Sequence, residues 1–107
     1  MKVEVLYFPD CPHYSTAVNT VRETLEQEGV LAEIVAVEVR GSAAAQQLRF
    51  LVSPSIRIDG RDIEVAARDS REFGVSCRTY VAHGRRAGTP PQEWIRAAVR
   101  DANGTLQ

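Results

Sequence analysis

The segment KVEVLYFPDCPHYS, residues 2–15, contains a predicted strand, a predicted helix start and a cysteine between them. Apolar and charged residues alternate over residues 2–8, and most of both faces is apolar, which favours a strand that is covered on two sides. From Pro12 onward, apolar side chains recur at helical spacing until Gly29, which suits the C-terminus of a helix. The sequence therefore predicts a strand, a turn that carries Cys11, and a long amphipathic helix.

The rest of the chain continues this alternation of strands and helices. Residues 32–39 are β-branched and apolar, as in a buried strand, and SAAAQQLRFL (42–51) suits a short helix that Pro54 ends. The runs SIRI and RDIE flank Asp59-Gly60, which is the signature of a tight hairpin turn. A loop or short helix, an edge strand and a final helix are then predicted over residues 65–76, 75–81 and 90–102.

Length and composition are those of an ordinary globular domain. The chain has 107 residues, of which 44% are hydrophobic and 25% are charged, and its formal net charge is -1. One domain with a single core suits this length. We expect a domain over residues 1–102 and a frayed tail over residues 103–107. The order of elements predicts an α/β sandwich of three layers, with a central mixed sheet of about four strands and helices on both faces.

Charge and hydropathy argue against nucleic acid and membranes as partners. The 13 basic residues are interspersed with acidic ones and form no one-sided stripe that would suit phosphate groups. The start of the chain lacks the apolar core of a signal peptide, and no later run approaches membrane-spanning length. We therefore expect a cytoplasmic protein, in which Cys11 and Cys77 stay reduced as reactive, metal-binding or inert thiols.

Two local segments, together with the order of elements, carry a family resemblance. FPDCPHY (8–14) has a cysteine at the start of the first helix, and VSPSIRIDG (52–60) has a proline directly before a predicted strand. In this combination the chain resembles the thioredoxin-like superfamily over residues 2–100, with Tyr14 in place of the second cysteine of C-x-x-C. With SCRTY (76–80) and GTPPQEW added, it is most similar to small bacterial thioredoxin-like proteins that are labelled alkylmercury-lyase-like.

The resemblance implies a thioredoxin-like sandwich and a site made of Cys11, Pro54 and Tyr14. It also implies a cis peptide bond before Pro54. That residue would then lie across from Cys11 and present its neighbouring backbone to an extended substrate. The alternative is an ordinary trans proline that only ends a helix.

Cys11 is the expected nucleophile of this site. If it stands at or next to the helix N-cap, the free amides of the first turn favour its thiolate, whereas Asp10 opposes it, so we expect a mildly activated thiol. Tyr14 cannot release a mixed disulfide, so an outside thiol such as glutathione, or Cys77, must resolve an adduct. The expected partners are low-molecular-weight thiols or protein thiols and disulfides, and no cofactor is expected.

Other uses of the same residues remain open. Cys11 and Cys77 could together bind a soft ion such as mercury or an organomercurial, because thiolates select soft metals. A zinc site formed with His13 and His83 is disfavoured by the spacing of these residues. Cys77 is equally well explained as a small buried hydrophobe. The replacement of the second cysteine by Tyr14 is also consistent with a redox-inactive interaction module.

Overall fold

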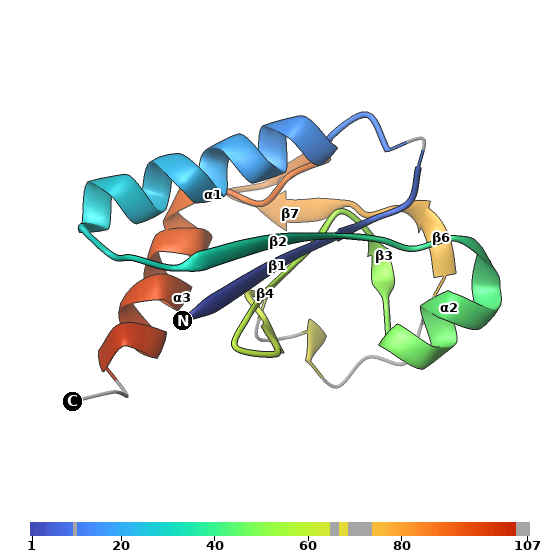
Figure 1. Cartoon of the computed structure of the whole chain (residues 1–107). Coiled ribbons are helices and arrows are strands. Elements are labelled where there is room, and N and C mark those ends of the chain that lie inside the picture. Colours follow the sequence, from blue (N-terminus) through green and yellow to red (C-terminus); the bar gives the residue numbers. More distant parts are fainter. Residues whose placement is uncertain (10, 65–66, 69–73, 105–107) are drawn as a thin grey trace.

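The computed structural model describes residues 1–9, 11–64, 67–68 and 74–104 (Figure 1). Its centre is a mixed sheet of four strands in the order β2-β1-β4-β5. These strands are β1 (Lys2–Tyr7), β2 (Glu33–Glu38), β4 (Ser55–Ile58) and β5 (Arg61–Asp62). β1 runs parallel to β2 and antiparallel to β4, which is antiparallel to β5. The predicted α/β fold, a thioredoxin-like three-layer sandwich, is confirmed.

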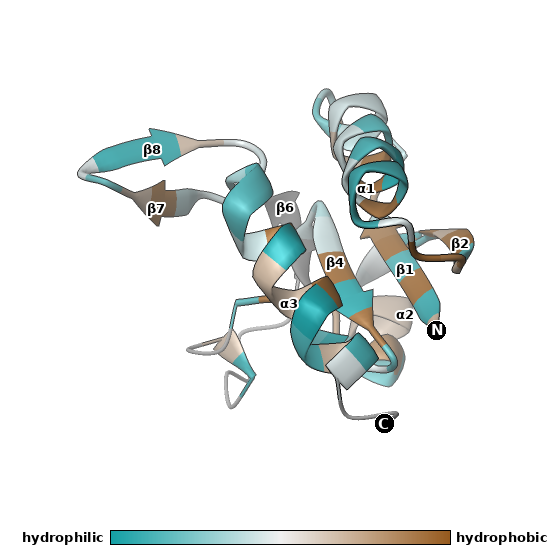
Figure 2. Ribbon diagram, turned by 90° about the vertical axis from the view of Figure 1, so that its left-hand side faces the viewer, coloured by the Kyte–Doolittle hydropathy of each residue, from teal (hydrophilic) through white to brown (hydrophobic). Residues whose placement is uncertain are grey.

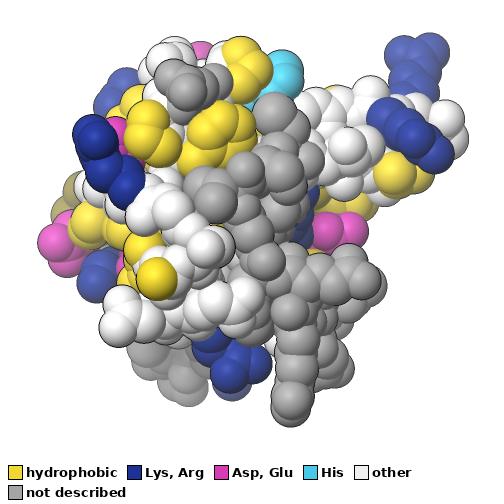
Figure 3. Space-filling view, turned by 90° about the vertical axis from the view of Figure 1, so that its right-hand side faces the viewer, with side chains coloured by type: hydrophobic (Ala, Val, Ile, Leu, Met, Phe, Trp, Pro, Cys, Tyr) yellow, Lys and Arg dark blue, Asp and Glu magenta, His cyan; other side chains and the backbone are white. Residues whose placement is uncertain are grey.

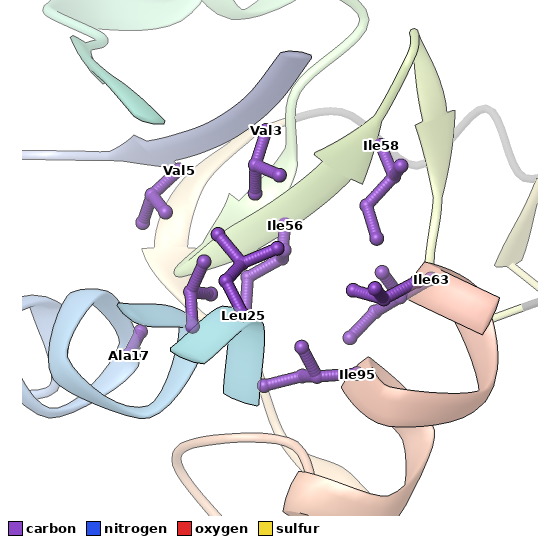
Figure 4. Close-up of a cluster of buried hydrophobic side chains, with 10 residues drawn as sticks. Val3, Val5, Ala17, Leu25, Ile56, Ile58, Ile63 and Ile95 are labelled. Carbon is purple, nitrogen blue, oxygen red and sulfur yellow. The ribbon is translucent and has the colours of Figure 1, made fainter. Parts of the chain in front are cut away.

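Helices lie on both faces of this sheet, as predicted. They are α1 (Tyr14–Glu28), α2 (Gly41–Leu48) and α3 (Gln92–Gly104). Alternation along β1 separates the two faces, because neighbouring side chains of a strand point in opposite directions. Val3 and Val5 join the core cluster under α1 and α3 (Figure 4). Leu6 instead packs with Ala45 of α2 and with Phe50 on the other face.

Helix α1 begins later than predicted. Its N-cap is His13, so Pro12 is not the first helical residue, and Cys11 lies two residues before the cap. A turn takes up this segment, in which the Cys11 amide donates to the Phe8 carbonyl at 3.0 Å. The predicted C-terminus is confirmed, because Gly29 adopts the left-handed conformation with φ of 64° and its amide bonds to the last helical turn.

Helix α2 ends earlier than predicted. Arg49 adopts a left-handed conformation with φ of 53°, and the Phe50 amide donates to the Ala45 carbonyl at 2.8 Å. This reversal carries the Phe50 side chain into the core. The chain then continues as β3 (Leu51–Ser53). The predicted short helix is confirmed, but its predicted end at residue 51, before Pro54, is wrong.

The hairpin at Asp59-Gly60 is confirmed. Both turn residues have positive φ, 50° and 85°, and they join two antiparallel strands. Asp59 also secures the hairpin to the start of the chain. Its carboxylate accepts the Lys2 amide at 2.9 Å, and its amide donates to the Lys2 carbonyl at 2.8 Å.

We expect Gly60→Ala to lower the free energy of unfolding by about 1 to 2 kcal/mol, because a Cβ atom is disfavoured at φ of +85°. The space around Gly60 is open, so the loss would come from backbone conformation and not from a clash. Gly104→Ala is the matched control: its surroundings are equally open and its φ is not left-handed. Urea denaturation measures both variants, and equal stabilities would contradict the prediction.

The predicted edge strand over 75–81 is divided into two strands. β6 (Gly74–Cys77) pairs in parallel with β3, and β7 (Tyr80–Ala82) pairs with β8 (Arg85–Ala87). The β7–β8 hairpin, which the sequence analysis did not predict, projects from the body of the molecule (Figure 2). The loop or short helix predicted over 65–76 lies mostly outside the described residues.

Helix α3 has the predicted apolar stripe. These side chains pack in the core cluster between the sheet and the helices α1 and α3. They are Trp94, Ile95, Ala98, Val99 and Ala102. The helix begins at Gln92, two residues later than the predicted start at residue 90, and the Gln92 side-chain amide donates to the Thr24 hydroxyl of α1 at 3.2 Å. It extends to Gly104, two residues beyond the predicted domain boundary, and residues 105–107 lie outside the described part. Within the described residues, no helix combines the length and apolar character that crossing a membrane requires.

Candidate functional site

A cis peptide bond joins Ser53 to Pro54, as the resemblance implies, and the alternative of a trans proline is excluded. This bond connects β3 to β4, so the proline sits at one end of the central sheet. Ser53, Pro54 and Ser55 are all buried, with Pro54 less than 2% exposed. The cis-proline loop, defined as these three residues, therefore lies inside the molecule.

Cys11 is connected to the cis-proline loop through Phe8. The Ser53 hydroxyl oxygen accepts the Phe8 amide at 3.3 Å, and the Phe8 carbonyl accepts the Cys11 amide at 3.0 Å. Tyr80 contacts the same loop, because its hydroxyl donates to the Pro54 carbonyl at 2.7 Å. Burial raises the pKa of Tyr80, the Arg78 guanidinium lowers it, and the Asp62 and Glu64 carboxylates add to the rise. Cys11, which is half-buried, thus lies at the same end of the sheet as Pro54.

Tyr14, which the resemblance places at the second cysteine of C-x-x-C, stacks on Tyr7. The ring centroids are 3.9 Å apart and the planes differ by 24°. Tyr7 is the last residue of β1 and Tyr14 the first of α1, so the stack joins the two elements on either side of the Cys11 turn. An aromatic pair contributes about 0.5 to 1.5 kcal/mol beyond its buried area. The stack therefore stabilises the position of the start of α1 relative to the end of β1.

His13 is turned toward the loop before α3. Its side chain makes no capping hydrogen bond to α1. The ring lies so close to the Gly88 backbone that a Cβ atom added to Gly88 would overlap it. The imidazole therefore occupies space that only a glycine leaves free. Figure 3 shows this end of the molecule, where several hydrophobic side chains reach the surface.

We expect Gly88→Ala to lower the free energy of unfolding by about 1 to 3 kcal/mol, as overpacking does, because the new methyl group displaces the His13 ring. His13→Ala removes the obstructing ring. In that background, Gly88→Ala should therefore cost much less stability than it does in the parent protein. Thermal and urea denaturation of the four proteins form a double-mutant cycle. Additive losses in the double variant would show that the two residues do not touch.

A buried ionic cluster, consisting of Arg78, Asp62, Glu64 and Ser55, lies next to the cis-proline loop. The Arg78 guanidinium donates to both Asp62 carboxylate oxygens, at 2.7 and 2.9 Å. It also donates to Glu64 at 2.8 Å and to the Ser55 hydroxyl at 3.0 Å. Only 6% of the Arg78 side chain and 4% of the Asp62 side chain are exposed. The charge therefore depends on these partners for its solvation.

The charge of Arg78 is stabilised by its acidic partners and by the ring of Tyr80. Burial lowers the pKa of Arg78, but its hydrogen bonds to Asp62 and Glu64 outweigh burial and keep that pKa above its ordinary value. The guanidinium lies 4.5 Å from the centre of the Tyr80 ring. That ring in turn makes an edge contact with Trp94, with centroids 6.2 Å apart. Contacts of the cluster thus reach from Asp62, in the β4–β5 hairpin, to Tyr80, whose hydroxyl donates to the Pro54 carbonyl.

The second cysteine lies on the other side of Ser53. The backbone of Cys77 is in β6, in register with Ser53 of β3. The amide of the next residue, Arg78, donates to the Ser53 carbonyl at 2.6 Å. Ser53 therefore contacts the Cys11 turn through its hydroxyl group and the strand of Cys77 through its backbone.

The remaining predicted residues lie elsewhere or outside the description. His83 is exposed in the β7–β8 hairpin, where its ring lies 2.6 Å from a Glu93 carboxylate oxygen. Asp10 is not among the described residues. Within the part of the chain that is described, no group of three or more His, Cys, Asp and Glu side chains is placed to hold a metal ion.

The motif SCRTY was used only for the resemblance, and the contacts of Arg78 with Asp62 and of Tyr80 with Pro54 were not predicted. Their partners Asp62 and Pro54 are 16 and 26 residues away, so no local pattern reports the contacts. One signal was available in the sequence: Arg78 lies between a cysteine and a threonine in a strand-like run. An arginine in such a run either faces solvent or is buried with an acidic partner.

Comparison with known proteins yields one match. A family model described as a domain of unknown function, DUF2703, matches residues 13–99. The matched range contains Tyr14, Pro54, Arg78 and Tyr80, and it begins two residues after Cys11. Neither a curated protein nor a solved structure matches the chain.

Proposed function

Since the chain belongs to the DUF2703 family, whose description assigns no activity, we propose a function from the site itself: a thioredoxin-like protein that uses Cys11 in monothiol exchange or as a carrier of thiol adducts. The observation that carries this proposal is the connection of the Cys11 turn to the cis-proline loop through Phe8 and Ser53. The proposed function would make the protein a thiol–disulfide oxidoreductase with one nucleophilic sulfur.

The proposed reaction has two exchange steps. The Cys11 thiolate attacks one sulfur of a disulfide, so a bond forms to Cys11 and the second sulfur leaves as a thiolate. A free thiol then attacks the adduct, which regenerates Cys11 and forms a new disulfide. Pro54 and Tyr14 position the sulfur in this scheme. Pro54 determines the shape of the cis-proline loop next to the Cys11 turn, and Tyr14 holds the start of α1 by stacking on Tyr7.

Labelling of Cys11 with a chromogenic aromatic disulfide at neutral pH tests this function. The Cys77→Ser variant leaves one thiol, and the peptide FPDCPHYS supplies the same local sequence without the fold. We expect the folded variant to react about 2 to 5 times faster than the peptide, which corresponds to about 0.5 to 1 kcal/mol, the stabilisation that a nearby helix N-terminus gives an anion. A variant that also carries Cys11→Ser is the blank.

Reaction no faster than that of the peptide would contradict the proposal. It would leave the third possibility, a redox-inactive interaction module. Complete resistance of Cys11 to the reagent in the folded protein, with normal labelling after denaturation, would support that alternative directly.

Capture of a soft ion by Cys11 and Cys77 is the second candidate function. The observation that favours it is the position of Ser53, which contacts the Cys11 turn on one side and pairs with Cys77 on the other. Two thiolates bind Hg²⁺ far more tightly than one. The test is competition for Hg²⁺ against a dithiol, in the parent and in Cys77→Ser. Equal affinities would exclude the two-thiolate site while leaving monothiol exchange untouched.

A further inference from the structure

The backbone on both sides of the cis peptide bond is already hydrogen-bonded within the chain. The Ser53 carbonyl accepts the Arg78 amide at 2.6 Å, and the Pro54 carbonyl accepts the Tyr80 hydroxyl at 2.7 Å. Pro54 has no N–H group. The next residue, Ser55, is paired with Leu6 in the central sheet. These internal contacts argue against the expectation that this backbone is presented to an extended substrate.

These internal contacts are anchored by groups that cannot easily withdraw. Arg78 follows β6 directly, and its guanidinium is held by Asp62 in the buried ionic cluster. Tyr80 is 1% exposed. A peptide strand that took the place of these two donors would have to pull the Arg78 charge away from its partners. Separating a buried ion pair in this way is strongly unfavourable.

Recognition of an extended polypeptide beside Pro54 needs free backbone groups, because an added strand binds through main-chain hydrogen bonds. A small thiol or disulfide has no such requirement and needs only access to the sulfur of Cys11, which is half-buried. We infer that the substrates of Cys11 are low-molecular-weight thiols and disulfides, and that the site does not recognise an extended polypeptide by strand addition, because the chain itself occupies the backbone of the cis-proline loop. This inference rests on the proposed function.

Exchange with a small disulfide balances without any other reactant. The Cys11 thiolate displaces one thiolate from the disulfide and retains the other half as a mixed disulfide. A second small thiol attacks that adduct, its proton passing to solvent, and a disulfide of the two small thiols leaves. Electrons pass only between sulfur atoms.

Two probes with the same leaving group separate the two substrate classes. Both are mixed disulfides with 2-nitro-5-thiobenzoate, one of N-acetylcysteine and one of a cysteine at the centre of a nine-residue uncharged peptide. Each reacts with the Cys77→Ser variant, and the released chromophore gives the rate constant. Each rate is divided by that of the same probe with the peptide FPDCPHYS. We expect the two normalised rates to agree within about threefold, since the longer probe gains no backbone contacts.

A normalised rate at least tenfold higher for the nine-residue probe would overturn the inference and leave monothiol exchange standing. Failure of both probes to exceed the rate of FPDCPHYS would overturn the inference together with the proposed function. These two failures are therefore distinguishable in a single experiment.

Amide hydrogen exchange of Arg78 provides a second measurement. Its N–H bond to Ser53 predicts slow exchange in the free protein and the same slow exchange after Cys11 carries the nine-residue peptide as a mixed disulfide. Acceleration of at least tenfold in that adduct would show that the peptide replaces Arg78 at the Ser53 carbonyl, and it would overturn the inference.

Discussion

Arg78→Met is expected to lower the free energy of unfolding by about 3 to 5 kcal/mol, the usual cost of removing one member of a buried ion pair. The substitution keeps an apolar side chain of similar length but leaves the buried Asp62 carboxylate without its two charged hydrogen bonds. It also removes a donor to Glu64 and the cation above the Tyr80 ring. Urea denaturation at pH 8 measures the loss.

The exposed pair of Arg40 and Glu38 is the matched control. It also has two hydrogen bonds, at 2.9 and 3.1 Å, but the Arg40 side chain is 73% exposed. Arg40→Met should therefore cost less than about 1 kcal/mol. Equal losses for the two arginine variants would show that burial of the cluster contributes nothing.

Ile56→Ala is expected to lower the free energy of unfolding by about 2 to 5 kcal/mol, the range for truncating a fully buried isoleucine. Ile56 has no exposed surface and lies in β4, in register with Val5. Its side chain is in the cluster between the sheet and α1 and α3, near Leu25 (Figure 4). Removing three carbon atoms there leaves a cavity that two helices and a sheet cannot close.

Two companion variants test the reason for this loss. Ile56→Val removes one carbon and should cost about 0.5 to 1.5 kcal/mol. Leu31→Ala removes a side chain that is 96% exposed and should change stability by less than about 0.5 kcal/mol. Urea denaturation measures all three variants. If Ile56→Ala behaves like Leu31→Ala, the described core is not the one that stabilises the protein.

The sequence by itself determined the elements that depend on close neighbours. The apolar pattern of residues 2–8, the left-handed Gly29 and the Asp59-Gly60 turn were all predicted, and their causes lie within a few residues of each. The cis bond before Pro54 followed only from the resemblance, because nothing local distinguishes a cis from a trans proline. Where local signals compete, as at Arg49, the chain reversed earlier than the pattern indicated, because burial of Phe50 outweighs another helical turn.

Tertiary structure alone decided how the candidate site is built. The contacts of Arg78 with Asp62, of Tyr80 with Pro54 and of Phe8 with Ser53 join residues 16, 26 and 45 positions apart. Helical and strand periodicity extend over a few residues and cannot report which distant groups meet. A buried arginine or a buried carbonyl is stable only where folding brings a partner to it. The use of the cis-proline backbone by the chain itself therefore became visible only once the strands were paired.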